Sequence, residues 1–287
     1  MKVFLKSGKK KIELTSRPYK LTQQLDLSGL QADVSISETT RDGGLHLGTR
    51  FGVRDVTIEG YFNTYGKSTI WIEERKKELY DLCNPKQLSQ IEIEENGERF
   101  FLEAHPIAFP TLPKDKRNKT HEFQTFLLQF VCSDPFLYKN EKVVTFANIT
   151  PMFSFPLTIE DPIVFGELSN SLIETIYNSG IDQSPLVIEM MATSSIKNPY
   201  LLNVYTQEKI SFTTDMVAGD IIFITTGRRK EISRIRNGVK TPFYYAMDLD
   251  STFLQLKKGD NIFRFGAEEN ENYLQIKMKY KEKVGGI

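Results

Sequence analysis

The chain has 287 residues, which is more than one hydrophobic core usually serves and leaves room for two domains. Lysine plus arginine and aspartate plus glutamate both number 37, so the formal net charge is zero. This balance argues against a class of protein that binds phosphate backbones through a general basic excess. With 40% hydrophobic residues, the composition is typical of a folded globular chain and excludes a disordered one.

The first residues and the cysteines indicate the compartment. Residues 1–14, MKVFLKSGKKKIEL, carry charges where a signal peptide needs an apolar stretch. The longest apolar runs, such as IIFI at 221–224, are too short to cross a bilayer. Two cysteines, Cys83 and Cys132, are too few for a disulfide framework, and we expect both thiols to be reduced. We therefore expect synthesis in the cytoplasm and no membrane contact.

The first half of the chain has the two-residue period of β-strands. Apolar and polar residues alternate in VSIS at 34–37, VTIE at 56–59 and IEIE at 91–94. The segment TFLLQFVC at 125–132 is apolar on one face and half apolar on the other, which predicts a central strand covered on both sides. The stretch GGLHLG at 43–48 lacks the Lys-Ser/Thr pair of a phosphate-binding loop, and it predicts a flexible loop between strands.

One segment departs from the strand pattern. Residues 68–83 predict an amphipathic helix that is capped at Ser68 or Thr69 and ends before Pro85. The apolar residues that share one face of this helix are Ile72, Leu79, Leu82 and Cys83. We expect this face to lie on a sheet.

The stretch SDPFLY at 133–138 ends the central strand. Pro135 cannot donate a hydrogen bond to a strand ladder, so the strand must stop at Asp134-Pro135. Phe136 and Tyr138 then supply two rings, which we expect to pack against the edge of the domain and fix the direction of exit. The sequence therefore predicts a domain-boundary motif made of Asp134, Pro135, Phe136 and Tyr138.

The second half predicts many short strands and no helix. Residues 139–170 carry several prolines, including Pro156 and Pro162, which suits a junction. Turn signals follow at Asn178-Ser179-Gly180, Gly219-Asp220, Asn237-Gly238 and Gly259-Asp260-Asn261. This spacing is typical of an antiparallel β-sandwich. The predicted fold class is mainly β, with an α+β domain over 1–140 and an all-β domain over 141–287.

No set of residues predicts catalysis, a cofactor or a metal, so we expect no enzymatic activity. The histidines are far apart and none has the spacing of a metal ligand: His46, His105 and His121. Both cysteines lie on apolar faces, which favours a role in packing over one as nucleophiles. The basic clusters at 9–11, 114–119 and 228–230 resemble hairpin tips or strand edges, and we expect no specific nucleic-acid binding.

Several motifs in chain order carry a resemblance to a known family. They are RDGGLHLGTRFGVRDVTIEGYF, IEERKKELYDLCNP, LLQFVCSDPFLY, IYNSGIDQSPLVIEM, NPYLLNVYTQEKISF, AGDIIFITTG, FLQLKKGDNIFRF and LQIKMKYKEKVGGI. Together they span nearly the whole chain and resemble the distal tail protein (Dit) family of tailed bacteriophages and prophages.

The resemblance implies a fold and a set of partners. It implies a split-barrel-like ring domain with one helix, followed by a galectin-like sandwich. Six copies would form a ring with a central channel that continues the tail tube and lets DNA pass. A tail-associated hub or lysin protein would cap this ring, and receptor-binding or baseplate proteins would attach to the sandwich. The expected location is the distal end of the tail in the virion.

A lectin-like adhesion module that binds host cell-wall saccharide is the alternative. Galectin-type sites use histidine and tryptophan, and residues 141–287 contain neither. Asn178, Arg228 and Tyr244 remain as residues that could contact a sugar. We therefore expect a protein-docking sandwich, while an uncharacterised hydrolase, which rests on size alone, is a third alternative.

Overall fold

The computed structural model describes residues 1–40, 42–146, 149–151, 166–168 and 172–287. It contains two compact units, of which the first comprises Met1–Asn140 and Lys283–Ile287 and the second Glu141–Glu282. The sequence had placed the whole of 141–287 in the second domain. The last five residues lie in the first unit instead, because Lys283 and Val284 pair with a strand of that unit. Most of the predicted junction at 139–170, including Pro156 and Pro162, lies outside the described residues.

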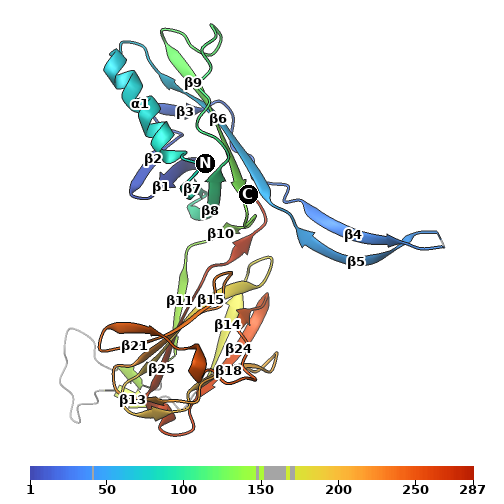
Figure 1. Cartoon of the computed structure of the whole chain (residues 1–287), viewed down its shortest axis with the longest axis vertical. Helices are drawn as coiled ribbons and strands as arrows, with labels where there is room; N and C mark the ends of the chain where they lie inside the picture. The colour runs from blue at the N-terminus through green and yellow to red at the C-terminus, as the bar shows by residue number, and fades with distance from the viewer. Residues whose placement is uncertain (41, 147–148, 152–165, 169–171) are drawn as a thin grey trace. The chain divides into compact units, whose positions relative to one another are not determined.

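The first unit is built on one curved antiparallel sheet that approaches a closed barrel, with helix α1 (Thr69–Leu82) packed against it (Figure 1). The strand order is β2-β1-β7-β8-β9-β6-β3, and β10 pairs with both β8 and β26. The strand bounds are β1 Lys2–Ser7, β2 Lys10–Glu13, β3 Tyr19–Leu21, β6 Arg54–Asn63, β7 Ser89–Glu95, β8 Glu98–Pro106, β9 Phe123–Cys132, β10 Leu137–Tyr138 and β26 Lys283–Val284. The sequence thus predicted the architecture of this unit correctly.

Strand β9 lies between β6 and β8, so it is a central strand, as the sequence predicted. Its pairing with β6 runs over ten residue pairs, from Arg54↔Cys132 to Asn63↔Phe123. Phe126, Leu128 and Phe130 are buried on one face of β9. The expectation of cover on both faces is wrong in part, because the second face is only half-buried and Gln129 is exposed.

Helix α1 confirms the prediction for residues 68–83 to within one residue at each end. The Ser68 side chain caps the helix by accepting a hydrogen bond from the Trp71 N–H at 3.2 Å. Leu79 and Leu82 are fully buried, so the predicted apolar face does lie on the sheet. The helix ends at Cys83, whose N–H donates to the Leu79 carbonyl.

The second unit is an antiparallel sandwich, as predicted. One sheet has the order β11-β25-β15-β20-β21-β22, with β23 beside β15, and the other has the order β14-β24-β17-β18. The bounds in the first sheet are β11 Lys142–Phe146, β15 Ser184–Ala192, β20 Ile221–Thr225, β21 Glu231–Arg236, β22 Val239–Pro242, β23 Gln255–Leu256 and β25 Leu274–Tyr280. The bounds in the second sheet are β14 Ile173–Asn178, β17 Tyr200–Asn203, β18 Glu208–Ser211 and β24 Gly259–Gly266.

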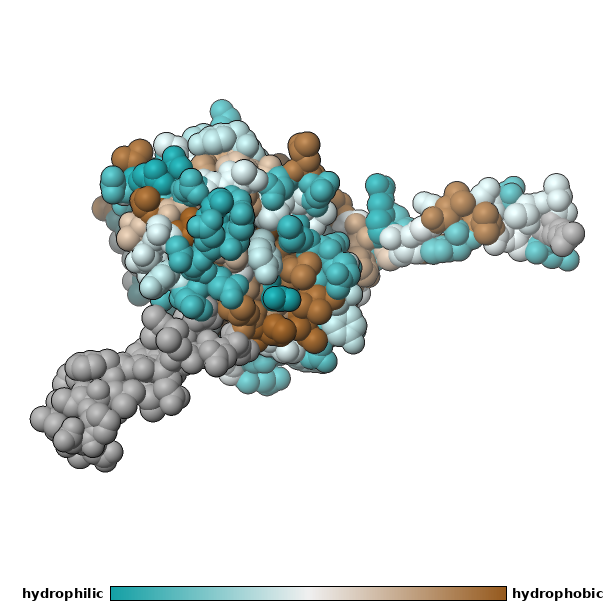
Figure 2. Space-filling view, turned by 90° about the horizontal axis from the view of Figure 1, so that it is seen from below, coloured by the Kyte–Doolittle hydropathy of each residue, from teal (hydrophilic) through white to brown (hydrophobic). Residues whose placement is uncertain are grey.

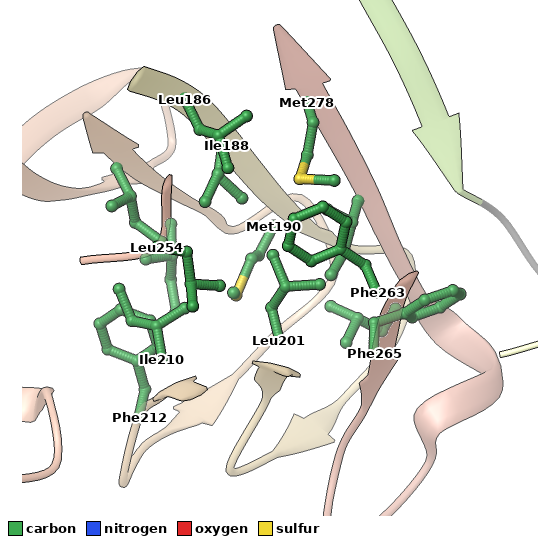
Figure 3. Close-up of a cluster of buried hydrophobic side chains, with 14 of the residues drawn as sticks. Leu186, Ile188, Met190, Leu201, Ile210, Phe212, Leu254, Phe263, Phe265 and Met278 are labelled. Atoms are coloured by element: carbon green, nitrogen blue, oxygen red, sulfur yellow. The ribbon is translucent and has the colours of Figure 1, made fainter. Parts of the chain in front are cut away.

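Short elements complete the second unit, and its core fills the space between the two sheets. Two small ladders join β12 to β13 and β16 to β19, and two 3₁₀ turns are present. Their bounds are β12 Ile149–Pro151, β13 Gly166–Leu168, β16 Ile196–Lys197, β19 Asp215–Met216, η1 Tyr244–Ala246 and η2 Glu271–Tyr273. In the core, Ile188 and Met190 of β15 lie opposite Leu201, Phe263 and Phe265 of the other sheet (Figure 3).

Candidate assembly site: an exposed arm and the junction at its base

Strands β4 (Ala32–Glu38) and β5 (Gly44–Phe51) form a separate two-stranded hairpin in the first unit, which we call the arm (Figure 1). Every residue of β4 is exposed, and in β5 only Gly48 is half-buried. Brown, hydrophobic residues lie along this projecting hairpin (Figure 2). A hairpin without a further strand or helix against it is at best marginally stable in water. The arm therefore exposes apolar surface that no other described element of its unit covers.

The apolar residues of the arm are large and well exposed. Val34 and Ile36 of β4 expose 52% and 63% of their surface, and Leu45 and Leu47 of β5 expose 60% and 64%. Several such side chains on one small element exceed the scattered exposed aliphatic residues that are normal on a monomer. This pattern indicates a surface for another protein chain.

The expected flexible loop at Gly43–Gly48 is wrong, because residues from Gly44 onward form strand β5. Only Gly43 lies in the turn, with φ +95°, a conformation that favours glycine. A side chain at Gly44 would bring its Cβ to 2.5 Å from Ile36 Cγ2, so glycine permits the close approach of the two strands. These glycines shape a hairpin and do not form a ligand loop.

The base of the arm contacts the residues that follow β9. The ring of Phe51, the last residue of β5, meets the ring of Phe136 edge-on at 5.4 Å between centroids. The Lys283 Nζ lies 4.6 Å from the centroid of the Phe136 ring. Phe136 is therefore held between the end of the arm and the strand that begins at Lys283.

Arg54 occupies the centre of this junction and exposes only 7% of its surface. Its Nε donates a hydrogen bond to the Pro135 carbonyl at 2.8 Å, and one terminal nitrogen donates to the Leu27 carbonyl at 2.6 Å. The other terminal nitrogen donates to the Gly285 carbonyl. Burial lowers the pKa of this guanidinium from its ordinary value, although arginine stays charged at neutral pH. A buried cation thus joins three separate stretches of backbone.

The four residues of the predicted boundary motif lie together at this junction. The Tyr138 hydroxyl donates to Asp134 Oδ2 at 2.8 Å, and the Phe136 N–H donates to Asp134 Oδ1 at 3.4 Å. Pro135 and Phe136 are buried, and Tyr138 is in β10. Sequence reasoning missed Arg54, because its three acceptors are backbone carbonyls and the sequence pattern gives no signal for such contacts.

The side chains offer little reactive chemistry. Burial raises the pKa of the Cys83 and Cys132 thiols to about 12, so both stay protonated and unreactive at neutral pH. Over the ranges that the structure describes, no three His, Cys, Asp or Glu side chains gather as a metal site would require. The helical segments among the same residues are too short or too polar for a membrane span.

The residues proposed for sugar contact differ in their access to solvent. Asn178 is fully buried, and its amide donates to the carbonyls of Asp182 and Leu256 while it accepts from the Gly180 N–H. It therefore supports a turn and cannot contact a saccharide. Tyr244 is half-exposed, and its hydroxyl donates to the Lys230 carbonyl.

The second unit matches a known protein family. Residues 179–283 match the family described as the siphovirus-type tail component, C-terminal domain. No curated protein sequence matches the chain.

Solved structures extend the likeness to both units. The chain resembles the SPP1 Dit (gp 19.1) protein of phages that infect Gram-positive bacteria, with 12% identity and a TM-score of 0.70 over 98% of this chain and 99% of that one. The chain has the Dit fold. A chain of the phage P2 baseplate in its activated conformation with Ca is similar, with 11% identity and a TM-score of 0.62 over 100% and 99% of the two chains. The resemblance to the Dit family that the sequence motifs indicated is confirmed at the level of the fold, and for residues 179–283 by the family match.

Proposed function

We propose that the chain is a structural distal tail protein that assembles six copies into a ring between the tail tube and the tail tip or baseplate. The ring encloses a central channel through which DNA passes. Copies are made in the host cytoplasm and end at the distal end of the tail in the virion. The role requires no cofactor and no catalytic residue.

The arm is the observation that carries this proposal. It presents four large aliphatic side chains that its own unit leaves uncovered, and these need a partner surface. In a closed ring of identical copies, each copy both offers its arm and receives one, so no arm stays exposed. The Dit fold and the tail-component match in the second unit support the same assignment.

Other partners follow from the same role. The tail tube protein lies on one side of the ring, and a tail-associated hub or lysin protein caps the other. Receptor-binding or baseplate proteins dock on the second unit. A zero net charge suits a channel for DNA, because strong phosphate contacts would retard the passage of the DNA.

Native mass spectrometry of the full chain at high concentration tests the ring. We expect a species of about 200 kDa, equal to six chains of 33.0 kDa. The double variant Ile36→Ser, Leu47→Ser should lose this species. As a matched control, Val239→Ser changes an aliphatic residue that is 62% exposed in the second unit and should assemble like the wild type.

Two outcomes would count against the proposal. If the double variant still forms the hexamer, the arm is not the assembly surface. If the wild-type chain stays monomeric, the saccharide-binding alternative gains support, and a glycan array probed with the full chain then decides it. Saturable binding to a cell-wall glycan would favour the adhesion module.

A further inference from the structure

Four separate stretches of the chain meet at one place in the first unit. Leu27–Ser28 lead toward the arm and Phe51–Arg54 lead away from it. Pro135–Tyr138 lead toward the second unit, and Lys283–Gly286 come back from it. The base of the arm and both connections to the second unit therefore share one cluster of residues.

Arg54 binds these stretches to one another. It belongs to the stretch that leaves the arm, and it donates hydrogen bonds to one carbonyl in each of the other three, at Leu27, Pro135 and Gly285. One side chain thus holds three stretches of backbone that are far apart in the sequence. Planar guanidinium groups suit this task because their donors point outward in fixed directions.

Two further contacts close the cluster. Gly286 is so near the chain that leads to the arm that a Cβ on it would lie 2.8 Å from the Leu27 carbonyl oxygen. On the other side, Phe136 packs between the ring of Phe51 and the ammonium of Lys283. The connections thus touch the arm base through backbone, aromatic and charged contacts.

This arrangement resists the movement of one stretch alone. If either connection moved, a carbonyl would leave the buried guanidinium, and an unpaired buried polar group is unfavourable. The lower-energy response is for the other stretches to move with Arg54. Energetic coupling between two sites requires a structural element that contacts both of them, and Arg54 is such an element for the arm base and the connections.

We propose that Arg54 is a positioning residue that couples the arm to both connections of the second unit. A displacement of the connections is transmitted to the arm base, and a displacement of the arm is transmitted to the connections. The biological role of this coupling rests on the proposed function. A protein that docks on the second unit would change how the arm contacts the neighbouring copy in the ring.

Hydrogen exchange on the full-length chain tests the coupling without requiring a ring. The readouts are two sets of amides. The arm-base set contains Gly52, whose N–H donates to the Gln31 carbonyl at 3.2 Å, and the connection set contains the paired strands β10 and β26. Amides of the β6–β9 ladder from Ile58↔Leu128 to Asn63↔Phe123, which lie away from Arg54, serve as the internal reference for the stability of the whole unit.

Arg54→Lys keeps the charge but cannot reach three carbonyls at once, so exchange should become faster in both sets and stay slow in the reference. Arg50→Lys is the matched control, since Arg50 lies on the arm, is 84% exposed and pairs with Asp33 at the surface. We expect Arg50→Lys to change neither set. Faster exchange in only one set, or in neither, overturns the proposal.

A reciprocal pair of variants keeps the test decisive if Arg54→Lys destabilises the reference strands. Phe136→Leu lies in the outgoing connection and should speed exchange at Gly52, while Phe51→Leu lies at the arm base and should speed exchange in β10 and β26. Coupling is reciprocal, so an effect in one direction alone contradicts it. This measurement reads amides at the junction and not the mass of an assembly, so it can fail while the hexamer still forms, or succeed while the hexamer does not.

Discussion

The arm and the β6–β9 pair are both antiparallel ladders with alternating apolar residues, yet their surroundings are opposite. Along β6 every second residue from Arg54 to Phe62 is buried, whereas every residue of β4 is exposed. The alternation specifies which side chains share a face, and only tertiary contacts decide whether that face is covered. In β6–β9 the cover comes from the same unit. In the arm no other described element of its unit supplies it, and under the proposed function it comes from another copy of the chain.

The largest expected effect distinguishes these two ladders by the same substitution. Leu128→Asp introduces an unpaired carboxylate at a position of β9 that is 1% exposed, and it should unfold the first unit at a cost of at least about 3 kcal/mol. Ile36→Asp in the arm should leave the free energy of unfolding of the single chain unchanged, because Ile36 is 63% exposed. Urea unfolding followed by circular dichroism measures both.

Either of two results would break the comparison. A Leu128→Asp chain that unfolds like the wild type would show that β9 is not a covered central strand. A destabilised Ile36→Asp chain would show that the arm packs on its own unit.

A second, smaller contrast concerns charges. Asp220 exposes 1% of its side chain and accepts a hydrogen bond from Arg236 Nε at 2.7 Å and one from the Val217 N–H. Asp220→Asn should cost about 1.5–3 kcal/mol, the range for a hydrogen bond to a charged group. Asp33 pairs with Arg50 on the arm with 60% of its side chain exposed, so Asp33→Asn should leave stability unchanged. Thermal unfolding of both variants makes the measurement.

The pH dependence of this difference checks its cause. Burial alone would raise the pKa of Asp220, but the hydrogen bonds from Arg236 and Val217 outweigh it and the pKa is lowered. A folded-state pKa below the unfolded one gives stability that is present at neutral pH and lost as the pH falls through the folded value. The difference between wild type and Asp220→Asn should therefore shrink below about pH 4. A difference that is constant down to low pH would contradict an ionic origin.

The smallest expected effect is a fluorescence shift from helix α1, which packs against the sheet of the first unit, whereas no described element of that unit packs against the arm. Trp71 is half-buried against the core of the first unit, 6.5 Å from the Phe62 ring between centroids. Its fluorescence emission should be blue-shifted in the native chain relative to the chain in urea. Identical native and unfolded spectra would show that this side of the helix is in water.

Sequence periodicity predicted helices and strands correctly where the apolar face of the element is buried within its own unit. The helix at 68–83 and strand β9 could be found because their apolar faces are buried within one unit. Strand β5 was missed because glycines at 43, 44 and 48 suggested a loop, whereas the turn uses only Gly43 and the close strand approach uses Gly44. Glycine serves both a turn with positive φ and a close approach of two strands, and the sequence alone does not distinguish these two roles.

The junction was only partly predictable. The strand break at Pro135 was visible from proline chemistry, and Phe136 was expected to pack against an edge. The role of Arg54 could not be predicted, because its acceptors are backbone carbonyls at Leu27, Pro135 and Gly285, which any residue type would supply. Contacts to backbone carbonyls cannot be recognised from the pattern of side chains. One of them, from Arg54 to Gly285, holds the last five residues in the first unit.

The burial of both native thiols makes the chain convenient to modify chemically. Cys83 and Cys132 are the two cysteines of the sequence, and each exposes 1% or less of its surface. A cysteine introduced at an exposed position of the arm, such as Ser37, would therefore be the only thiol that a dye or spin label reaches in the folded protein. The wild-type sequence is already a suitable background for following the arm by fluorescence or by distance measurements between labels.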